Sequence, residues 1–297
     1  MYDIIIIGGS AAGLTAAIYA TRRALKTLVL TAEIGGLMAK NSEIENWPGE
    51  LKINGVELAN RMKTQVENFG ADLKLELVQK ISSDKSGFSV VTSKGIYQGK
   101  TILLAFGKSP RVLKVPGEEK YLGRGVSYCA TCDAPLYREK NVAVIGGGNS
   151  ALDAAVLLSK IAAKVYIIHR KSEFRGDEYL IKKVTNSDKI EAIMDSELKE
   201  IRGNEIVGGV VLKDGKEIKV DGVFIEIGYI VNDSLIEGIV DIDQLGQVIV
   251  NHNQETSVPG IYAAGDLTNM PFQQLVIAAG EGATAALSAY DYIQKNF

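Results

Sequence analysis

The sequence has 297 residues, of which 46% are hydrophobic and 23% charged, and its formal net charge is −3. This length favours about two domains, and the composition is typical of a globular α/β enzyme. The near-neutral charge argues against a nucleic-acid-binding protein, because neutralising phosphates requires a basic surface. No apolar stretch approaches the roughly 18 residues that span a bilayer. The apolar opening at residues 4–7 is too short for a signal peptide. We therefore expect a cytoplasmic protein without a membrane or nucleic-acid partner.

One motif occurs twice along the chain. Residues 4–32 align with residues 142–170 without a gap at a single offset (146 − 8 = 138), which places Gly8 on Gly146. Each copy has a run of β-branched residues, a glycine-rich turn, an apolar stretch at helical spacing and a second β-branched run. This is the pattern of a βαβ unit.

In such a unit the glycines let the backbone approach a pyrophosphate, and the helix N-terminus offers it free N–H groups. Ser10 replaces the second glycine of the first copy, whereas Gly148 keeps it in the second copy. A serine is small and can bond a phosphate, so the motif tolerates it. We expect an α/β fold with two Rossmann-like, three-layer dinucleotide-binding domains of the FAD/NAD(P)-binding type.

The end of the second strand indicates which nucleotide each copy binds. An acidic residue there bonds a free ribose 2′-hydroxyl, whereas basic residues accommodate a 2′-phosphate. Glu33 lies near this place in the first copy, which is consistent with FAD. In the second copy the strand ends without a carboxylate and runs into His169, Arg170, Lys171 and, a little later, Arg175. These cations suit a phosphate and favour NADPH, with a solvated basic turn as the alternative.

Cys129 and Cys132 are the only cysteines, and they form a Cys-x-x-Cys motif ahead of the second βαβ unit. Two cysteines cannot complete a Cys₄ zinc site, and the two histidines lack ligand-like spacing, so no metal is expected. In a reducing compartment such a pair is more often catalytic than structural. A helix that begins at the pair, with Pro135 in its first turn, would lower the thiol pKa. Asp133 is either an acid/base for thiol exchange or a carboxylate that stabilises the helix start.

Further stretches make the pattern specific. They are residues 45–49 (ENWPG), 123–127 (GRGVS), 129–133 (CATCD), 146–151 (GGGNSA), the basic cluster at 169–175 and residues 263–266 (AAGD). Taken together they resemble the low-molecular-weight thioredoxin reductases, the class II pyridine nucleotide-disulfide oxidoreductases that use FAD and NADPH. The resemblance extends over nearly the whole chain.

The resemblance implies a domain organisation. Residues 1–110 and 239–297 would form a discontinuous FAD-binding domain, and residues 111–238 an NADPH-binding domain that carries the cysteine pair. It also implies a homodimer in which the NADPH domain rotates between two positions. One places the nicotinamide against the flavin, and the other exposes the thiols to the partner protein.

The same resemblance implies the site residues. FAD would be held by Gly8, Ser10, Ala11, Gly13, Glu33, Gly35, Gly36, Leu37, Asn46, Val78, Ala105, Gly107, Asp266, Gln274 and Leu275. NADPH would be held by Gly146, Gly148, Asn149, Ser150, His169, Arg170, Lys171 and Arg175. Cys132 is implied to face the flavin, Cys129 to attack the partner's disulfide, and Asp133 to act as acid/base. A helix opening near Gln274 would aim its positive N-terminus at the flavin ring.

Some positions depart from the family pattern. Gln273 replaces an arginine, Lys171 replaces a second arginine of the basic cluster, Phe106 replaces a threonine, and no proline precedes Asn232. None of these changes removes a reacting group.

The expected activity is thioredoxin-disulfide reduction, a role in cell redox homeostasis in which electrons pass from NADPH through FAD and the cysteine pair. One set of alternatives keeps this chemistry but takes NADH or ferredoxin as donor. Another takes a glutaredoxin-like protein, a peroxiredoxin or a small dithiol as acceptor. A third alternative is a flavin-bound redox sensor that does not turn over. Two intact glycine-rich units and the basic cluster favour the nucleotide-dependent enzyme.

Overall fold

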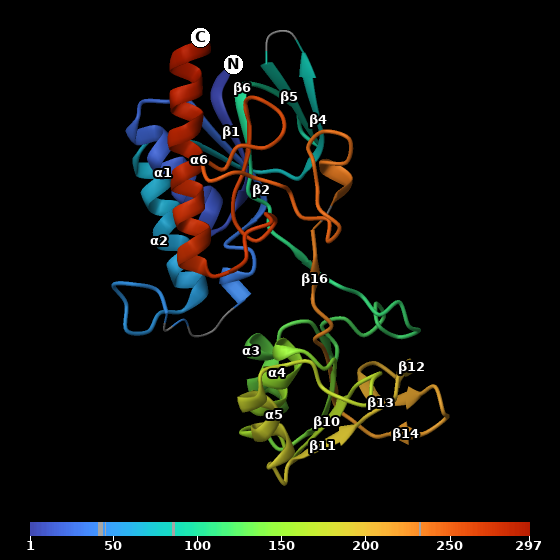
Figure 1. Cartoon of the computed structure of the whole chain (residues 1–297). Helices are drawn as coiled ribbons and strands as arrows, with labels where there is room; N and C mark the ends of the chain where they lie inside the picture. Colours follow the sequence, from blue (N-terminus) through green and yellow to red (C-terminus); the bar gives the residue numbers. More distant parts are fainter. Residues whose placement is uncertain (41–43, 45, 85–86, 232) are drawn as a thin grey trace. The chain divides into compact units, whose positions relative to one another are not determined.

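The computed structural model describes residues 1–297 except 41–43, 45, 85–86 and 232, so Asn232 lies outside the described residues. The side chains of residues 40, 84, 132 and 233 lie outside the described part as well. The chain divides into two compact units (Figure 1). Unit 1 comprises Met1–Ser109 and Ile230–Phe297, and unit 2 comprises Pro110–Tyr229.

Unit 1 is built around a seven-stranded sheet with the order β3-β2-β1-β6-β5-β4, in which β17 also pairs with β6. Strands β1, β2, β3, β6 and β17 pair in parallel, whereas β4, β5 and β6 form an antiparallel meander. The strands are β1 Tyr2–Gly9, β2 Thr27–Ile34, β3 Asp72–Leu75, β4 Val78–Asp84, β5 Gly87–Thr92, β6 Ile96–Leu104 and β17 Ile261–Ala263. The helices are α1 Ala11–Arg22, α2 Gly55–Asn68 and α6 Leu275–Asn296, with short 3₁₀ turns η1 Met38–Lys40 and η3 Asp233–Leu235.

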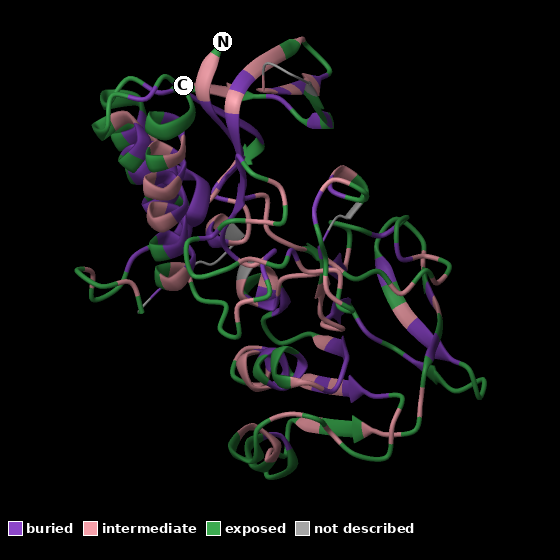
Figure 2. Ribbon diagram, turned by 45° about the horizontal axis from the view of Figure 1, so that its top comes forward, coloured by how far each residue is buried: buried purple, intermediate pink, exposed green. Residues whose placement is uncertain are grey.

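Strand β1 is buried on both faces, which explains its unbroken run of isoleucines. Ile4 and Ile6 pack on one face with α1, α2 and α6, whereas Ile5 and Ile7 pack on the other face with the β4–β5 meander. Figure 2 shows the resulting pattern, in which the central strands are buried and the covering helices carry an exposed side. Helices α1 and α6 cross closely, because a Cβ on Gly282 would lie 2.1 Å from the Ala12 carbonyl oxygen.

Unit 2 contains a five-stranded sheet with the order β11-β10-β9-β15-β8, in which every pair is parallel. Its strands are β8 Val126–Ser127, β9 Asn141–Ile145, β10 Lys164–Ile168, β11 Ile190–Ile193 and β15 Gly222–Ile225. Its helices are α3 Ala130–Asp133, α4 Asn149–Ser159 and α5 Glu178–Thr185, with the 3₁₀ turn η2 Ala134–Tyr137. The helices pack on one face of the five-stranded sheet. The opposite face is covered by a small antiparallel sheet of β12 Leu198–Gly203, β13 Val207–Leu212 and β14 Glu217–Ile218.

Both predicted βαβ units are confirmed, and their strands pair in the same register: Ile4 pairs with Thr27 as Val142 pairs with Val165. Helix α1 begins at Ala11 and α4 at Asn149, which are separated by the same offset that aligns the two sequence motifs. Each unit has three layers, and together they confirm the predicted α/β fold class. Among the described residues, no helix is long and apolar enough to cross a membrane.

The connections between the units lie in β7 Ser109–Pro110 and β16 Tyr229–Ile230, which pair as a two-stranded sheet. The first crossing agrees closely with the expected boundary after residue 110. The second falls at Ile230, whereas the sequence placed it at residue 239. The difference has a packing cause: Val231, Ile236 and Val240 are buried in the core of unit 1, so the chain has already returned there.

Candidate active site

The glycine-rich turn after β1 requires glycine at two positions. Gly8 has φ +124°, and a Cβ on it would lie 2.2 Å from the Ala105 carbonyl oxygen. A Cβ on Gly13 would lie 1.9 Å from the carbonyl oxygen of Gly8, because helix α1 begins directly against the turn. The turn is therefore a cradle of bare backbone at the carboxyl end of β1, the arrangement that admits a pyrophosphate.

Ser10 fits its position without strain. Its backbone is extended, with φ −115°, and the equivalent Gly148 has a similar φ of −98°. Neither value requires a glycine. The Ser10 hydroxyl donates to the carbonyl oxygen of Gly35 at 2.6 Å, which ties the glycine-rich turn to the loop after β2. The serine thus holds together two predicted parts of the flavin site.

Three helices begin in a way that favours an anion. Helices α1, α4 and α6 have no side-chain cap and no acidic residue in their first turn. By contrast, α2 is capped by Asn54 and carries Glu57 in its first turn. The free N–H groups and positive dipole end of an uncapped helix suit a phosphate or an electron-rich group. These are the three helices expected to meet the two cofactors.

Unit 1 brings most of the predicted flavin residues to one edge of its sheet. Residues at the carboxyl ends of the parallel strands β1, β2, β6 and β17 are Gly8, Ser10, Gly35, Gly36, Ala105, Gly107 and Asp266. Ala11 and Gly13 lie in α1, Leu37 follows the Gly35–Gly36 turn, and Leu275 begins α6. The Asn46 side-chain amide donates to the Gln274 side-chain oxygen at 3.1 Å, so two predicted residues 228 positions apart lie in contact. Glu33 is exposed near the end of β2.

Val78 is the first residue of strand β4. Its side chain is 5% exposed and belongs to the core. It follows the carboxyl end of β3, where Glu76 donates its N–H to the Thr31 carbonyl oxygen at 2.8 Å. The segment just before Val78 therefore lies beside the end of β2.

Two charged residues beside Asp266 escaped the sequence reasoning. Burial raises the pKa of the Asp266 carboxyl, and the nearby Lys108 opposes the shift. Burial lowers the pKa of Lys108, whereas Asp266 and Asp243 oppose that shift. Glu281 is 8% exposed and accepts the N–H of Gly265 at 2.7 Å. An acid inside the apolar stretch AAGEGA of α6 was the available signal for Glu281.

The second glycine-rich turn repeats the geometry of the first. Gly146 has φ +148°, and a Cβ on it would lie 2.2 Å from the Glu226 carbonyl oxygen. The loop after β10 folds onto this turn: the N–H of Arg175 donates to the Gly147 carbonyl oxygen at 2.7 Å. The N–H of Asp177 donates to the Asn149 side-chain oxygen, also at 2.7 Å. These bonds bring the basic cluster next to the predicted phosphate cradle, where Ser150 is exposed in the first turn of α4.

The basic cluster contains one buried residue, His169, and it has a lysine where the first copy has a glutamate. His169 is 9% exposed and its ring stacks on Phe174, with the centroids 6.0 Å apart. Burial lowers the pKa of the His169 ring, a backbone hydrogen bond with Glu173 opposes the shift, and the surrounding cations lower the pKa further. Its Nε2 is buried without a partner among the described atoms, which fits a polar ligand group placed there. Lys171 occupies the position that corresponds, at the same offset, to Glu33 of the first copy.

The cysteine pair follows β8 at the carboxyl edge of the same sheet. Cys129 directly precedes α3 and is disulfide-bonded, whereas the side chain of Cys132 lies outside the described part. The backbone of Cys129 is held by Ser127, whose Oγ accepts its N–H at 3.0 Å and donates to its carbonyl oxygen at 3.2 Å. The predicted helix start is confirmed, but α3 has a single turn and continues into η2, with Pro135 at its beginning. Asp133 is the last residue of α3.

Glu226 is a further residue that the sequence reasoning missed. It directly follows β15, and its Oε1 accepts the N–H of Ala130 at 3.4 Å, beside Cys129. Burial raises its pKa to about 7. The sequence contained a weak signal, a carboxylate that interrupts the apolar run GVFIEIG.

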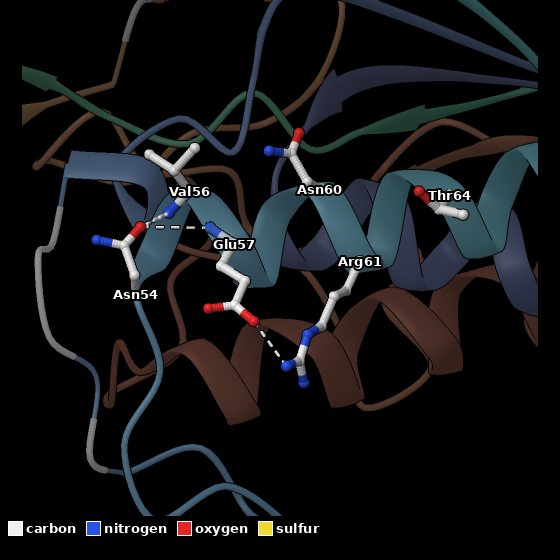
Figure 3. A pocket seen from close by; sticks show the side chains of 6 residues that line it. All are labelled: Asn54, Val56, Glu57, Asn60, Arg61 and Thr64. Carbon is white, nitrogen blue, oxygen red and sulfur yellow. Dashed lines mark hydrogen bonds and ion pairs between the residues drawn. The ribbon is translucent and has the colours of Figure 1, made fainter.

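Helix α2 carries a separate surface hollow of about 750 Å³ (Figure 3). It is lined by Asn54, Val56, Glu57, Asn60, Arg61 and Thr64. Arg61 pairs with Glu57 at 2.6 Å, and none of the predicted site residues lines the hollow. Within the described residues, no group of three or more histidine, cysteine, aspartate or glutamate side chains could hold a metal ion. Neither observation changes the location of the candidate site.

Comparison with known proteins identifies the family of the chain. The family model of the pyridine nucleotide-disulphide oxidoreductases matches residues 2–282. The thioredoxin reductase of Mycolicibacterium smegmatis is 39% identical, over 99% of this chain and 97% of the relative. That of Peptoclostridium litorale is 36% identical, over 100% and 98%. The crystal structure of Lactococcus lactis thioredoxin reductase superimposes with a TM-score of 0.88 and 36% identity, covering 99% of this chain and 100% of that one. The chain therefore belongs to the pyridine nucleotide-disulphide oxidoreductase family of enzymes, and within it to the thioredoxin reductases.

Proposed function

We propose that the chain is an NADPH-dependent thioredoxin-disulfide reductase that binds one FAD per subunit and works through Cys129 and Cys132. One observation carries the proposal: the Cys-x-x-Cys segment and the second glycine-rich turn share the carboxyl edge of one parallel sheet. Strand β8 leads into the cysteines, β9 leads into Gly146, and β15 lies between them. This arrangement supports a dithiol site next to a nucleotide-binding turn within a single unit.

The residues present fit both cofactors. In unit 1 the bare turn at Gly8, the uncapped start of α1 and the Ser10–Gly35 bond support binding of the FAD pyrophosphate. In unit 2 the turn at Gly146, the uncapped α4 and the unpartnered Nε2 of His169 support binding of the nicotinamide nucleotide. Bound FAD supplies the chemistry that converts a hydride from the nucleotide into an electron pair for a disulfide.

The charge inversion between the two copies supports NADPH as the donor. Glu33 suits a ribose with a free 2′-hydroxyl, whereas Lys171 at the equivalent position suits a 2′-phosphate. Arg170 and Arg175 are exposed and offer guanidinium groups to the same phosphate. Lys171, Arg170 and Arg175 thus supply the positive charge for that phosphate.

The cysteine pair would carry out thiol–disulfide exchange with the partner protein. The Cys129 thiolate attacks one sulfur of the partner's disulfide, forming a mixed disulfide and releasing the other sulfur as a thiolate. Cys132 then attacks the sulfur of Cys129, which re-forms the intramolecular disulfide and releases the second partner sulfur. Asp133, next to Cys132, would supply the proton that the departing thiolate takes up. The two bonds of Ser127 hold the Cys129 backbone during this exchange.

The test is steady-state oxidation of NADPH and, separately, of NADH by FAD-loaded protein, with thioredoxin as acceptor and Cys132→Ser as control. The proposal expects turnover with NADPH that the control abolishes. Turnover with a peroxiredoxin or glutaredoxin-like protein but not with thioredoxin would reassign the acceptor. Consumption of a single equivalent of NADPH without turnover would overturn the enzyme assignment. Light scattering of the same sample tests the proposed homodimer.

A further inference from the structure

Glu226 lies between the two functional parts of unit 2. Its backbone carbonyl blocks any side chain on Gly146 of the nucleotide turn, since a Cβ there would lie 2.2 Å away. Its carboxylate reaches the thiol segment, where it accepts the N–H of Ala130 at 3.4 Å. One residue therefore touches both the nucleotide cradle and the backbone next to Cys129.

The internal repeat shows that a carboxylate is not needed here for the fold. In unit 1 the N–H of Ala105 donates to the Ile7 carbonyl oxygen at 2.8 Å, and in unit 2 the N–H of Glu226 donates to that of Ile145 at 2.8 Å. Ile7 and Ile145 are equivalent at the motif offset, so Ala105 and Glu226 occupy the same structural position. The first unit uses a methyl group there. The carboxylate is therefore an addition in the second unit, and it accompanies the thiol segment, which unit 1 does not have.

The carboxylate is also poised to change its charge near neutral pH. Burial raises the pKa of Glu226 to about 7, and the hydrogen bond from the Ala130 N–H, at 3.4 Å, opposes this shift. A charged group beside a thiol alters the stability of the thiolate, and a negative charge disfavours it.

We propose that Glu226 is a positioning residue for the cysteine pair: it anchors the backbone at Ala130 and couples protonation of its own carboxyl to the charge on Cys129. The coupling is reciprocal, because a thiolate at Cys129 favours the neutral carboxyl as much as a carboxylate favours the neutral thiol. Reduction of the pair would thus be accompanied by proton uptake at Glu226. This inference rests on the proposed function, since it assigns the cysteine pair as the reacting group.

Other titratable groups face the same region and must be separated from Glu226. Burial and the nearby Glu226 carboxylate both raise the pKa of Tyr229, so its hydroxyl stays neutral through this pH range. Asp133 is the carboxylate of α3 itself. An Asp133→Asn variant therefore accompanies the Glu226 variants, so that a pH effect can be assigned to one carboxylate or the other.

The experiment measures the alkylation rate of Cys129 by iodoacetamide in protein reduced chemically and freed of reductant. The pH runs from about 5 to about 9, the range that covers a raised glutamate and a thiol. Glu226→Gln removes the charge but keeps an acceptor for Ala130. At about pH 7 and slightly above, this variant should react roughly threefold to tenfold faster than wild type. At low pH the two rates should coincide, because wild-type Glu226 is then neutral, and they should converge again when both thiols are ionised.

Hydrogen exchange of the peptide spanning residues 127–133 tests the anchoring. Glu226→Ala, which lacks an acceptor, should exchange faster there than wild type, whereas Glu226→Gln should not. Glu226→Asp, which keeps the charge, should retain the wild-type shape of the pH profile. Glu205→Gln, at an exposed position in unit 2, is the matched control for a lost carboxylate and should leave both readouts unchanged.

A ratio of Glu226→Gln to wild-type rates that stays constant across the pH range would overturn the coupling. Unchanged exchange in Glu226→Ala would overturn the anchoring. Both readouts use a chemical reductant and need neither NADPH nor a protein acceptor. If NADPH turnover fails while the Glu226 effects persist, the reductase assignment is wrong and the coupling stands. If turnover succeeds and the effects are absent, only the Glu226 inference is lost.

Discussion

The Ser10 hydroxyl donates to the Gly35 carbonyl oxygen at 2.6 Å, and this bond joins the glycine-rich turn after β1 to the loop after β2. A second bond reinforces it, from the N–H of Gly35 to the carbonyl oxygen of Gly9 at 2.7 Å. The loop bears Gly36 and Leu37, so the serine ties the glycine-rich turn to two further residues predicted to hold FAD. A glycine at this position could not make the side-chain bond.

The variant Ser10→Ala should therefore weaken FAD binding without disturbing the backbone, because φ −115° suits alanine. The Gly35 carbonyl oxygen still accepts the N–H of Met38 at 3.0 Å, so the loss stays near one hydrogen bond. We expect the dissociation constant for FAD to rise by roughly fivefold, about 1 kcal/mol. Titration of the apoprotein with FAD, followed by flavin fluorescence, gives this number.

The matched control is Ser159→Ala, which removes a similar hydroxyl-to-carbonyl bond of 2.8 Å from the end of α4 in unit 2. It should leave FAD affinity unchanged. Equal affinities of Ser10→Ala and wild type would show that the remaining backbone bonds of Gly35 hold the loop on their own.

The two glycines of the second turn should respond differently to alanine. Gly146→Ala places a Cβ 2.2 Å from a carbonyl oxygen at φ +148°, so the turn must distort, and unit 2 should lose several kcal/mol of stability. Gly148→Ala meets open space at φ −98° and should keep wild-type stability. Its methyl group would instead occupy the approach of the pyrophosphate and raise the KM for NADPH. Urea unfolding and steady-state kinetics of the two variants separate these effects, and equal stabilities would contradict the steric argument.

The sequence predicted the parts of the structure that local patterns encode. The paired βαβ units, the starts of α1, α4 and α6, and the cysteine segment at a helix start each depend on a contiguous motif. The point at which the chain returns to unit 1 depends on burial of Val231 and Ile236 against distant strands, which no contiguous motif encodes. Apolar residues in a connecting segment do not reveal which of two cores they enter.

The residues missed at the site share one physical cause. Lys108, Glu226 and Glu281 lie outside any motif, and their influence comes from partners far away in sequence. Periodicity and spacing report the backbone pattern, whereas these side chains matter through burial and charge. The internal repeat could have raised attention to Glu226, but only the structure shows that it corresponds to Ala105.

The charge at position 171 should control the choice between the two nicotinamide nucleotides. Lys171→Glu reproduces the residue found at the equivalent position of the first copy and places a carboxylate where we propose the 2′-phosphate binds. We expect kcat/KM for NADPH to fall by about tenfold or more, whereas that for NADH should change little. The ratio of the two values is the measurement.

Lys160→Glu provides the same charge change at the exposed far end of α4 and should leave the ratio unaltered. An equal loss for both nucleotides in Lys171→Glu would mean that the lysine acts on a shared part of the cofactor. The 2′-phosphate assignment would then move to Arg170 or Arg175.

The raised pKa of Glu226 predicts a specific dependence of stability on pH. Burial raises the pKa of this carboxyl to about 7 in the folded protein, above the usual glutamate value of 4.5, so the folded protein binds the proton more tightly than the unfolded chain. Stability from this group is therefore fully present below about pH 4.5 and declines as the pH rises through about 7. Glu226→Gln lacks the ionisable group, so above neutral pH it should be more stable than wild type by roughly 1–3 kcal/mol. Near pH 4.5 the advantage should largely vanish.

Urea unfolding of the apoprotein at several pH values, followed by far-ultraviolet circular dichroism, measures the difference between the two curves. The informative quantity is the change with pH in the difference between the unfolding free energies of Glu226→Gln and wild type. The other titrating groups are common to both proteins, so their contributions cancel. Glu205→Gln should track wild type throughout, since its carboxylate is exposed. A constant difference between Glu226→Gln and wild type would mean that Glu226 ionises normally in the folded state. The carboxylate beside Ala130 would then be charged at every physiological pH and could not store a proton for the cysteine pair.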